Sequence, residues 1–156
     1  MNIFNKIKKD HDEAREIMDK ILKTPQVKKR QELFGQLKVA ILSHAKSEEE
    51  TFYKSLRKNG DKEMKEEIPH FKEEHEEVEK LFKSIEKLDP DDYMWWEQFG
   101  ELRKALTHHM KEEEEDVFPD ARKDIPKTEA QEIGEEMADI EEEEKNALMR
   151  KEGMAA

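Results

Sequence analysis

The chain contains no cysteine among its 156 residues. Disulfides, thiolate metal sites and iron–sulfur clusters are therefore excluded. It has only five glycines and five prolines, with no glycine-rich loop of the kind that binds phosphate and no nucleophile–base set. Classical hydrolase and kinase activities are not supported. The sequence also lacks a long apolar run, and its first ten residues, MNIFNKIKKD, predict neither a signal peptide nor a membrane span. We expect a cytoplasmic protein.

Basic residues are fewer than acidic ones. The chain has 29 Lys and Arg against 41 Asp and Glu, which gives a formal net charge of -12. A field of this sign repels phosphate backbones and anionic lipids, so we expect no nucleic-acid and no membrane partner. Cations are favoured instead. The sequence does not indicate a protein partner.

The apolar residues, 34% of the chain, recur at spacings of three and four, which is typical of amphipathic helices. We expect helices over about residues 2–23, 25–58, 61–88, 91–118 and 128–150. Pro69 predicts a kink or break near Ile68, and Pro119 predicts the end of the fourth helix. The predicted fold is all-α: an antiparallel up-and-down four-helix bundle over residues 1–120. Residues 121–156 are expected to hold an additional C-terminal helix that docks on the bundle or projects from it.

One ten-residue phrase occurs twice, as HAKSEEETFY from His44 and as HMKEEEEDVF from His109. Each begins with His, has Glu at the fifth place and ends on an aromatic residue. His44 and Glu48 therefore share one helix face, as do His109 and Glu113. These polar side chains stand in the apolar stripe that should face the core.

The other two predicted stripes contain one His each, His11 and His75. The chain then consists of two helical hairpins, each supplying His and then His-x-x-x-Glu. Buried imidazoles need hydrogen-bond partners, and a buried carboxylate is strongly unfavourable unless paired or metal-bound. One or two cations would satisfy all six groups together. The candidate metal ligands are His11, His44, Glu48, His75, His109 and Glu113.

Imidazole and carboxylate together suit iron, manganese or zinc. Two Glu can bridge two metals, so that each metal has two His nitrogens and one oxygen from each Glu. An octahedral iron would keep about two positions free for an oxo or hydroxo bridge and an exogenous ligand. The residues therefore suit a pair of iron, manganese or zinc ions, and an iron pair would take a small ligand such as dioxygen, nitric oxide or peroxide.

The segments KKDHDEAR, LSHAKSEEETFY, KEEHEEVEKLF and LTHHMKEEEEDVFP resemble, in order and spacing, the hemerythrin-like (HHE cation-binding) family over residues 1–120. The resemblance implies an up-and-down four-helix bundle with a non-haem di-iron centre. It implies that His11, His44, His75 and His109 are terminal ligands and that Glu48 and Glu113 are bridges.

The chain departs from the oxygen-carrying hemerythrins at two points. They have a further His four places before the equivalent of His75, where this chain has Phe71, and His70 lies one place off. They also have Asp five places after the last His, where this chain has Glu113 at four. A set of four His and two Glu is more similar to the iron-sensing and iron–sulfur-repair branches of the family.

Some residues and functions stay open. His108 is expected to be exposed, although it could replace His109 as a ligand together with Glu112. Tyr53 could gate access to the site, but it is interpreted as a packing residue because its counterpart in the second phrase is Phe118. The acidic runs at 112–116 and 141–144 are interpreted as solvated faces. The first functional hypothesis is a di-iron protein that binds or senses a small ligand or reports iron availability. A di-iron enzyme that reduces peroxide or nitric oxide or acts as an oxidase, and a metal-free helical interaction protein, are the alternatives.

Overall fold

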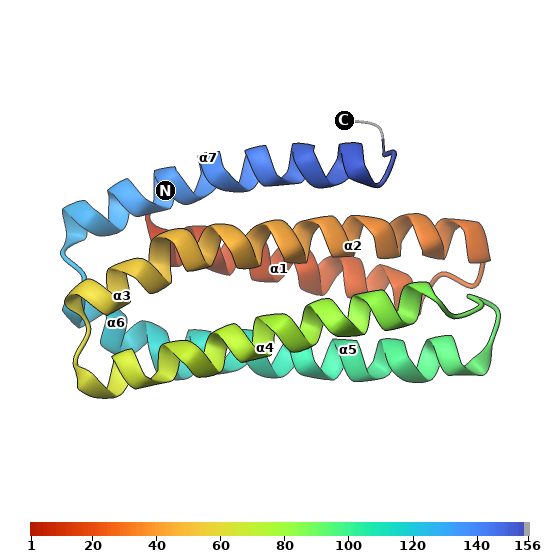
Figure 1. The fold of residues 1–156 in the computed structure, drawn as a ribbon, viewed down its shortest axis with the longest axis horizontal. Coiled ribbons are helices and arrows are strands. Elements are labelled where there is room, and N and C mark those ends of the chain that lie inside the picture. Colours follow the sequence, from red (N-terminus) through yellow and green to blue (C-terminus); the bar gives the residue numbers. More distant parts are fainter. Residues whose placement is uncertain (155–156) are drawn as a thin grey trace.

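The computed structural model describes residues 1–154, which form helices joined by short turns (Figure 1). No strand forms within this range, so the all-α prediction is confirmed. The elements are α1 (Ile3–Leu22), α2 (Val27–Glu48), η1 (Glu49–Tyr53), α3 (Lys54–Asn59), α4 (Lys62–Glu86), α5 (Tyr93–Glu112), η2 (Glu113–Val117), α6 (Phe118–Asp124) and α7 (Lys127–Lys151).

Two hairpins make the predicted bundle. Helix α1 pairs with the continuous rod α2–η1–α3, and α4 pairs with the rod α5–η2–α6 (Figure 1). Their apolar faces bury two separate hydrophobic clusters, one toward each end of the bundle. Phe4, Phe52 and Phe118 pack edge to face at one end, and Phe34, Trp95 and Phe99 pack together at the other. Burial of each such side chain contributes roughly 1.5–3 kcal/mol, and this offsets the polar layer between the clusters.

The polar layer arises from the order of residues along each helix. On α1, His11 lies between Ile7 of the first cluster and Ala14 of the second. On α4, His75 likewise lies between Phe71 and Val78. The candidate ligands on the other two rods occupy the same level, so the bundle has an apolar core that is interrupted once.

Both rods that contribute a Glu contain a π-helical turn at this level. The segment η1 directly follows Glu48, and η2 begins at Glu113. A π turn inserts one extra residue into an α-helix and is frequent at functional sites. The two repeated phrases of the sequence therefore share a local backbone feature that helical periodicity did not predict.

The break predicted near Ile68 and the helix end predicted at Pro119 are both wrong. Helix α4 runs through Pro69 without interruption. Pro69 is exposed, so water can reach the Lys65 carbonyl that the ring leaves without its helical partner. The fourth rod also does not end at Pro119, which lies in the first turn of α6, where its missing N–H is tolerated.

Helix α7 packs along α1 and α2, on the side away from α4 and α5 (Figure 1). Gly134 allows this approach, because a Cβ there would lie 2.6 Å from the carbonyl carbon of Asn2. Of the segment expected at 121–156, residues 121–124 lie inside α6, and residues 155–156 lie outside the described residues. None of the helices described over residues 1–154 combines the length and apolarity needed to cross a membrane.

Candidate metal centre

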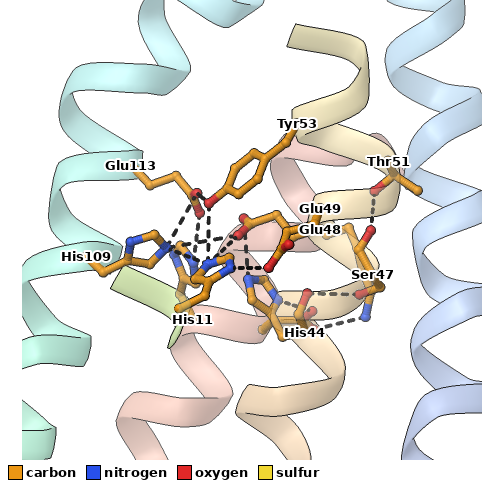
Figure 2. A network of polar contacts seen from close by, with 12 residues as sticks. His11, His44, Ser47, Glu48, Glu49, Thr51, Tyr53, His109 and Glu113 are labelled. Atoms are coloured by element: carbon orange, nitrogen blue, oxygen red, sulfur yellow. Dashed lines mark hydrogen bonds and ion pairs between the residues drawn. The ribbon is translucent and has the colours of Figure 1, made fainter. Parts of the chain in front are cut away.

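The six candidate ligands converge in the polar layer. Figure 2 shows five of them, His11, His44, Glu48, His109 and Glu113. Glu48 and Glu113 are fully buried, and the imidazoles of His11, His44 and His109 are buried with them. His75 is at the edge, with its side chain 10% exposed. The structure thus brings together all six residues that the sequence singled out, from four different rods of the bundle.

The imidazoles of each hairpin form a pair. The ring centroids of His11 and His44 are 5.2 Å apart, and those of His75 and His109 are 4.8 Å apart. His75 Nε2 lies 3.1 Å from His109 Nε2. Two nitrogens at right angles around one ion, each about 2.1 Å from it, would be about 3.0 Å apart. The spacing of this pair therefore suits a shared cation.

Glu48 connects the two pairs. Its Oε2 lies 3.4 Å from His44 Nε2 in the first pair, and its Oε1 lies 3.3 Å from His75 Nε2 in the second. Each oxygen of this one carboxylate therefore faces a different pair of imidazoles.

Glu113 repeats the arrangement from the opposite rod. Its Oε1 lies 3.2 Å from His11 Nε2, and its Oε2 lies 3.8 Å from His109 Nε2. The centre therefore consists of two sets of donors. His11 and His44 lie with Glu48 and Glu113, and His75 and His109 lie with Glu48, with Glu113 Oε2 slightly farther away.

Several inward atoms of the centre have no hydrogen-bond partner among the described residues. These atoms are His11 Nε2, His44 Nε2, both oxygens of Glu48 and Glu113 Oε1. An unpaired buried polar atom costs on the order of 1–3 kcal/mol, and a charged one costs more. A cation between the two carboxylates would satisfy these atoms together, so the residues fit a metal site.

The outward nitrogen of every imidazole bonds a carboxylate on a neighbouring rod. Within each hairpin, the residue before the first His serves the second His. Asp10 Oδ2 lies 2.8 Å from His44 Nδ1, and Glu74 Oε1 lies 2.9 Å from His109 Nδ1. Because an ionised carboxylate can only accept, Nδ1 carries the proton and Nε2 faces the centre.

Between hairpins, the residue after each bridging Glu serves the first His of the other hairpin. Glu49 Oε2 lies 2.9 Å from His75 Nδ1, and Glu114 Oε2 lies 2.6 Å from His11 Nδ1. Sequence reasoning missed all four outer carboxylates. The signal was present as an acidic residue before His11 and His75 and a second Glu after Glu48 and Glu113.

The charges of the centre shift one another's pKa values. Burial alone would lower the pKa of His44 and His109, but Glu48 and the outer carboxylates raise it, to about 10 for His109. Against the effect of burial, the imidazoles hold the pKa of Glu48 well below its ordinary value. Burial and the charge of Glu48 raise the pKa of Glu113. Without a cation, protons on the imidazoles therefore offset the negative charge of the carboxylates. A bound metal would displace these protons.

Comparison with known proteins agrees with this geometry. The Hemerythrin HHE cation binding domain family matches residues 2–121. The chain belongs to this family. The crystal structure of a hemerythrin HHE cation binding domain-containing protein from Mycobacterium kansasii superposes with a TM-score of 0.83, covering 94% of this chain and 89% of that one. At 22% identity that likeness shows the fold alone, and it confirms the predicted bundle.

A curated relative is named DNA nickase, from Nostoc sp. (strain PCC 7120 / SAG 25.82 / UTEX 2576). It is 25% identical over 128 residues, which are 80% of this chain but 35% of that protein. The chain thus spans about a third of the length of this relative.

Tyr53 belongs to the centre of this HHE domain, and its interpretation as a packing residue is incomplete. Its hydroxyl donates to Glu113 Oε2 at 3.0 Å (Figure 2). It also lies 3.4 Å from His75 Nε2. Burial and the charges of Glu113 and Glu48 raise the pKa of Tyr53 well above its ordinary value, so the phenol keeps its proton. Phe118 ends the second repeat and has no such group. The two halves of the HHE centre therefore differ here.

Helix α7 supplies the outer layer of the HHE centre with Glu141, which is 2% exposed. Lys6 Nζ donates to Asp10 Oδ1 at 2.9 Å and to Glu141 Oε1 at 3.0 Å, and Asp10 in turn bonds His44. The prediction of solvated acidic runs is thus wrong for Glu141, and it is wrong for Glu114, which bonds His11. Helical periodicity alone does not show where a fifth helix docks.

A small cavity of about 30 Å³ lies beside the imidazoles of the HHE centre. It borders the hydrophobic cluster that contains Phe34, Trp95 and Phe99, and residues of that cluster line it, among them Ile41, Val78 and Leu106. A cavity needs roughly 10–15 Å³ of such space to hold one water molecule, so a water or a diatomic molecule fits here. The buried centre therefore has room next to it for a very small molecule.

His70 and His108 are not part of the buried HHE centre. Their side chains are 51% and 67% exposed, and both face Glu74 and Glu112 at the surface. The alternative in which His108 and Glu112 replace the His109 set is not what the structure shows, because His109 is the one that points inward.

Proposed function

We propose that this HHE domain holds two non-haem iron ions and binds a small ligand such as dioxygen, nitric oxide or peroxide at them. The observation that carries the proposal is the division of the centre into two donor sets joined by buried carboxylates: Glu48 belongs to both sets, and Glu113 belongs to the first set and lies 3.8 Å from His109 of the second. A single structural ion would need only one set. Two sets joined by carboxylates suit a pair of metals.

Each ion would have its own imidazoles. His11 and His44 would bind one ion, His75 and His109 the other, with Glu48 and Glu113 bridging both. Imidazole with carboxylate suits iron, and manganese or zinc could substitute. When bound, iron supplies redox activity and coordination positions for an exogenous ligand.

The surroundings support a small ligand rather than a large substrate. The cavity beside the imidazoles is about 30 Å³, and apolar side chains such as Ile41, Val78 and Leu106 form part of its wall. A diatomic molecule fits such a space, whereas a drug-sized ligand needs roughly 300 Å³ or more. On the other side of the centre, Tyr53 presents a hydrogen-bond donor.

Nitric oxide, added anaerobically to the ferrous protein, is the direct probe of ligand binding. We expect a saturable change in absorption that is absent from the metal-free chain. Val78→Ile adds a methylene beside the cavity and should slow the reaction, whereas Val39→Ile makes the same change at a buried position outside the cavity. An iron-loaded protein that gives no spectral response to nitric oxide, dioxygen or peroxide would overturn this proposal.

The enzymatic alternative predicts turnover instead of saturation. Peroxide added to the iron-loaded protein would then be consumed in many equivalents per centre. Consumption of about one equivalent per centre, with a lasting spectral change, favours binding or sensing.

The metal-free interaction protein predicts no stoichiometric metal and little loss of stability on chelation. The activity named for the longer Nostoc relative, DNA nicking, is not carried over to this chain. Its net charge of -12 disfavours contact with a phosphate backbone. We therefore propose neither as the function of this chain.

A further inference from the structure

Two exposed histidines have no role in the buried centre. His70 lies four places before Glu74 on α4, and His108 lies four places before Glu112 on α5. These are two more His-x-x-x-Glu pairs on neighbouring helices. Each pair presents its imidazole and its carboxylate on one face, as the buried pairs do.

The four side chains face one another across the two helices. His70 Nε2 lies 3.6 Å from both Glu74 Oε2 and Glu112 Oε1. His108 Nε2 lies 3.0 Å from Glu112 Oε2 and 3.9 Å from Glu74 Oε2. One donor atom from each of His70, Glu74 and Glu112 lies within 4.8 Å of the other two. This compactness is what a single ion requires.

Within the described part of the chain, the carboxylates of this group pair only with imidazoles. Glu74 and Glu112 are 15% and 20% exposed, and among residues 1–154 neither forms an ion pair with Lys or Arg. An exposed His–Glu pair alone contributes little to stability. Two half-buried carboxylates that point at the same place repel each other, and a cation between them would reverse that repulsion.

The group stands at the edge of an acidic hollow. This hollow has a volume of about 370 Å³ and includes His70 and Glu112 in its wall. No Lys or Arg lines it, within the part of the chain that the structure describes. A concave surface of one charge sign raises the local concentration of counter-ions. Its other carboxylates are Asp61, Glu63, Glu67, Asp116 and Asp120.

We propose that His70, Glu74 and Glu112, with His108 at the rim, form a third metal site that binds a divalent transition-metal ion at the surface. Imidazole nitrogens with carboxylate oxygens suit zinc, ferrous iron or cobalt rather than magnesium. Glu74 joins this surface site to the buried centre, because its Oε2 faces the surface imidazoles while its Oε1 bonds His109. The surface site does not require iron in the buried centre.

Zinc alone is the probe, titrated calorimetrically into the protein whose buried centre is already filled with metal. The wild-type chain should bind about one further zinc ion. The double variant His70→Ala with His108→Ala should weaken this step about tenfold or more, since even loss of an outer partner has that effect on metal affinity. Glu112→Gln should also weaken it, and Glu115→Gln, an exposed change of equal charge, should not.

The surface and buried sites are separated by a reciprocal variant. His44→Ala should remove buried metal and leave the surface zinc step intact, whereas the double variant should leave buried metal in place. Circular dichroism and thermal unfolding check that each variant folds. Zinc binding that is equal in Glu112→Gln and Glu115→Gln, or unchanged in the double variant, would show only diffuse attraction by the net charge of -12 and would overturn the surface site.

Discussion

Each imidazole of the centre is held from outside by a carboxylate on another rod. His11, for example, has Glu114 on its Nδ1 at 2.6 Å, and Arg15 also bonds Glu114 at 2.9 Å. Such outer partners fix the ring and its tautomer and make the inward nitrogen a better ligand. The centre is therefore preorganised for cations by residues that would not touch them.

The first residue-scale prediction concerns these outer carboxylates. Glu49→Gln and Glu114→Gln should each lower metal affinity by about 10–100-fold, because the imidazole loses its charged partner. Glu50→Gln and Glu115→Gln remove the same charge at exposed neighbours and should change little. Competition with a coloured chelator measures the difference. Equal affinities in the two sets would show that the outer bonds have no part in metal binding.

A second prediction concerns the phenol of Tyr53. Tyr53→Phe removes a buried hydrogen bond to Glu113 and should destabilise the metal-free protein by about 1–3 kcal/mol. Tyr93→Phe makes the same change at a side chain that is 74% exposed and should have almost no effect. Urea unfolding of both variants tests this. If the two lose the same stability, the Tyr53 hydrogen bond contributes nothing.

At the residue scale, the sequence predicts the inner ligands and not their supports. His44, Glu48, His109 and Glu113 were found because polar residues stood where apolar ones were expected. Asp10 could not be found in this way, because it serves a His on another helix. That pairing depends on how two helices are rotated against each other, which a pattern along one helix does not contain.

At the scale of helices, the sequence predicts where the helices lie but not where they depart from regular α-helical geometry. The 3–4 spacing predicts the rods, but it does not reveal η1 and η2, where one extra residue enters the helix. The prediction at Pro119 failed for a related reason. A proline that follows a π turn begins a new α-helical segment instead of ending the rod.

A pair of glycines tests the docking of α7. Gly100 is exposed on α5, and a methyl group added there would have no neighbouring side chain within 4 Å, so Gly100→Ala should stabilise the fold by about 0.5–1 kcal/mol. Gly134→Ala should do the opposite, because its methyl group would clash with the backbone at Asn2. Urea unfolding of the two variants should give changes of opposite sign. A stabilised Gly134→Ala variant would mean that α7 does not lie against the N-terminal segment as described.

At the scale of the whole molecule, the buried imidazoles link stability to pH and to metal. The metal-free fold raises the pKa of His44, His75 and His109, the last to about 10. An unfolded His titrates near about 6.5. The stability that these protonated rings confer is therefore complete below about pH 6.5 and is lost as the pH rises toward 10.

The metal-free protein should accordingly have a lower Tm at pH 9 than at pH 7. In the metal-loaded protein the same rings are neutral and bound, so they should add almost no pH dependence over this range. Thermal unfolding followed by circular dichroism, at both pH values and with and without metal, measures the effect. A metal-free protein that is equally stable at pH 7 and pH 9 would contradict the assigned charges.

The composition predicts that the molecule favours cations, but it does not predict how α7 packs against the bundle. The excess of acidic residues favours cations, and many of those residues do lie around the centre or the acidic hollow. The position of α7 was left open between docking and projecting, since a thin apolar stripe is compatible with both. Its contact through Glu141 arises only when the fifth helix packs on the bundle.

The most direct test of the central claim is the metal content of the aerobically purified protein, together with its visible and near-ultraviolet spectrum. After exposed metal has been removed with a chelator, the account predicts about two irons per chain, the absorption of an oxo-bridged diferric pair, and a sharp loss of iron in His44→Ala and Glu113→Ala. Zinc alone after growth in iron-rich medium, or full iron content in both variants, would contradict it.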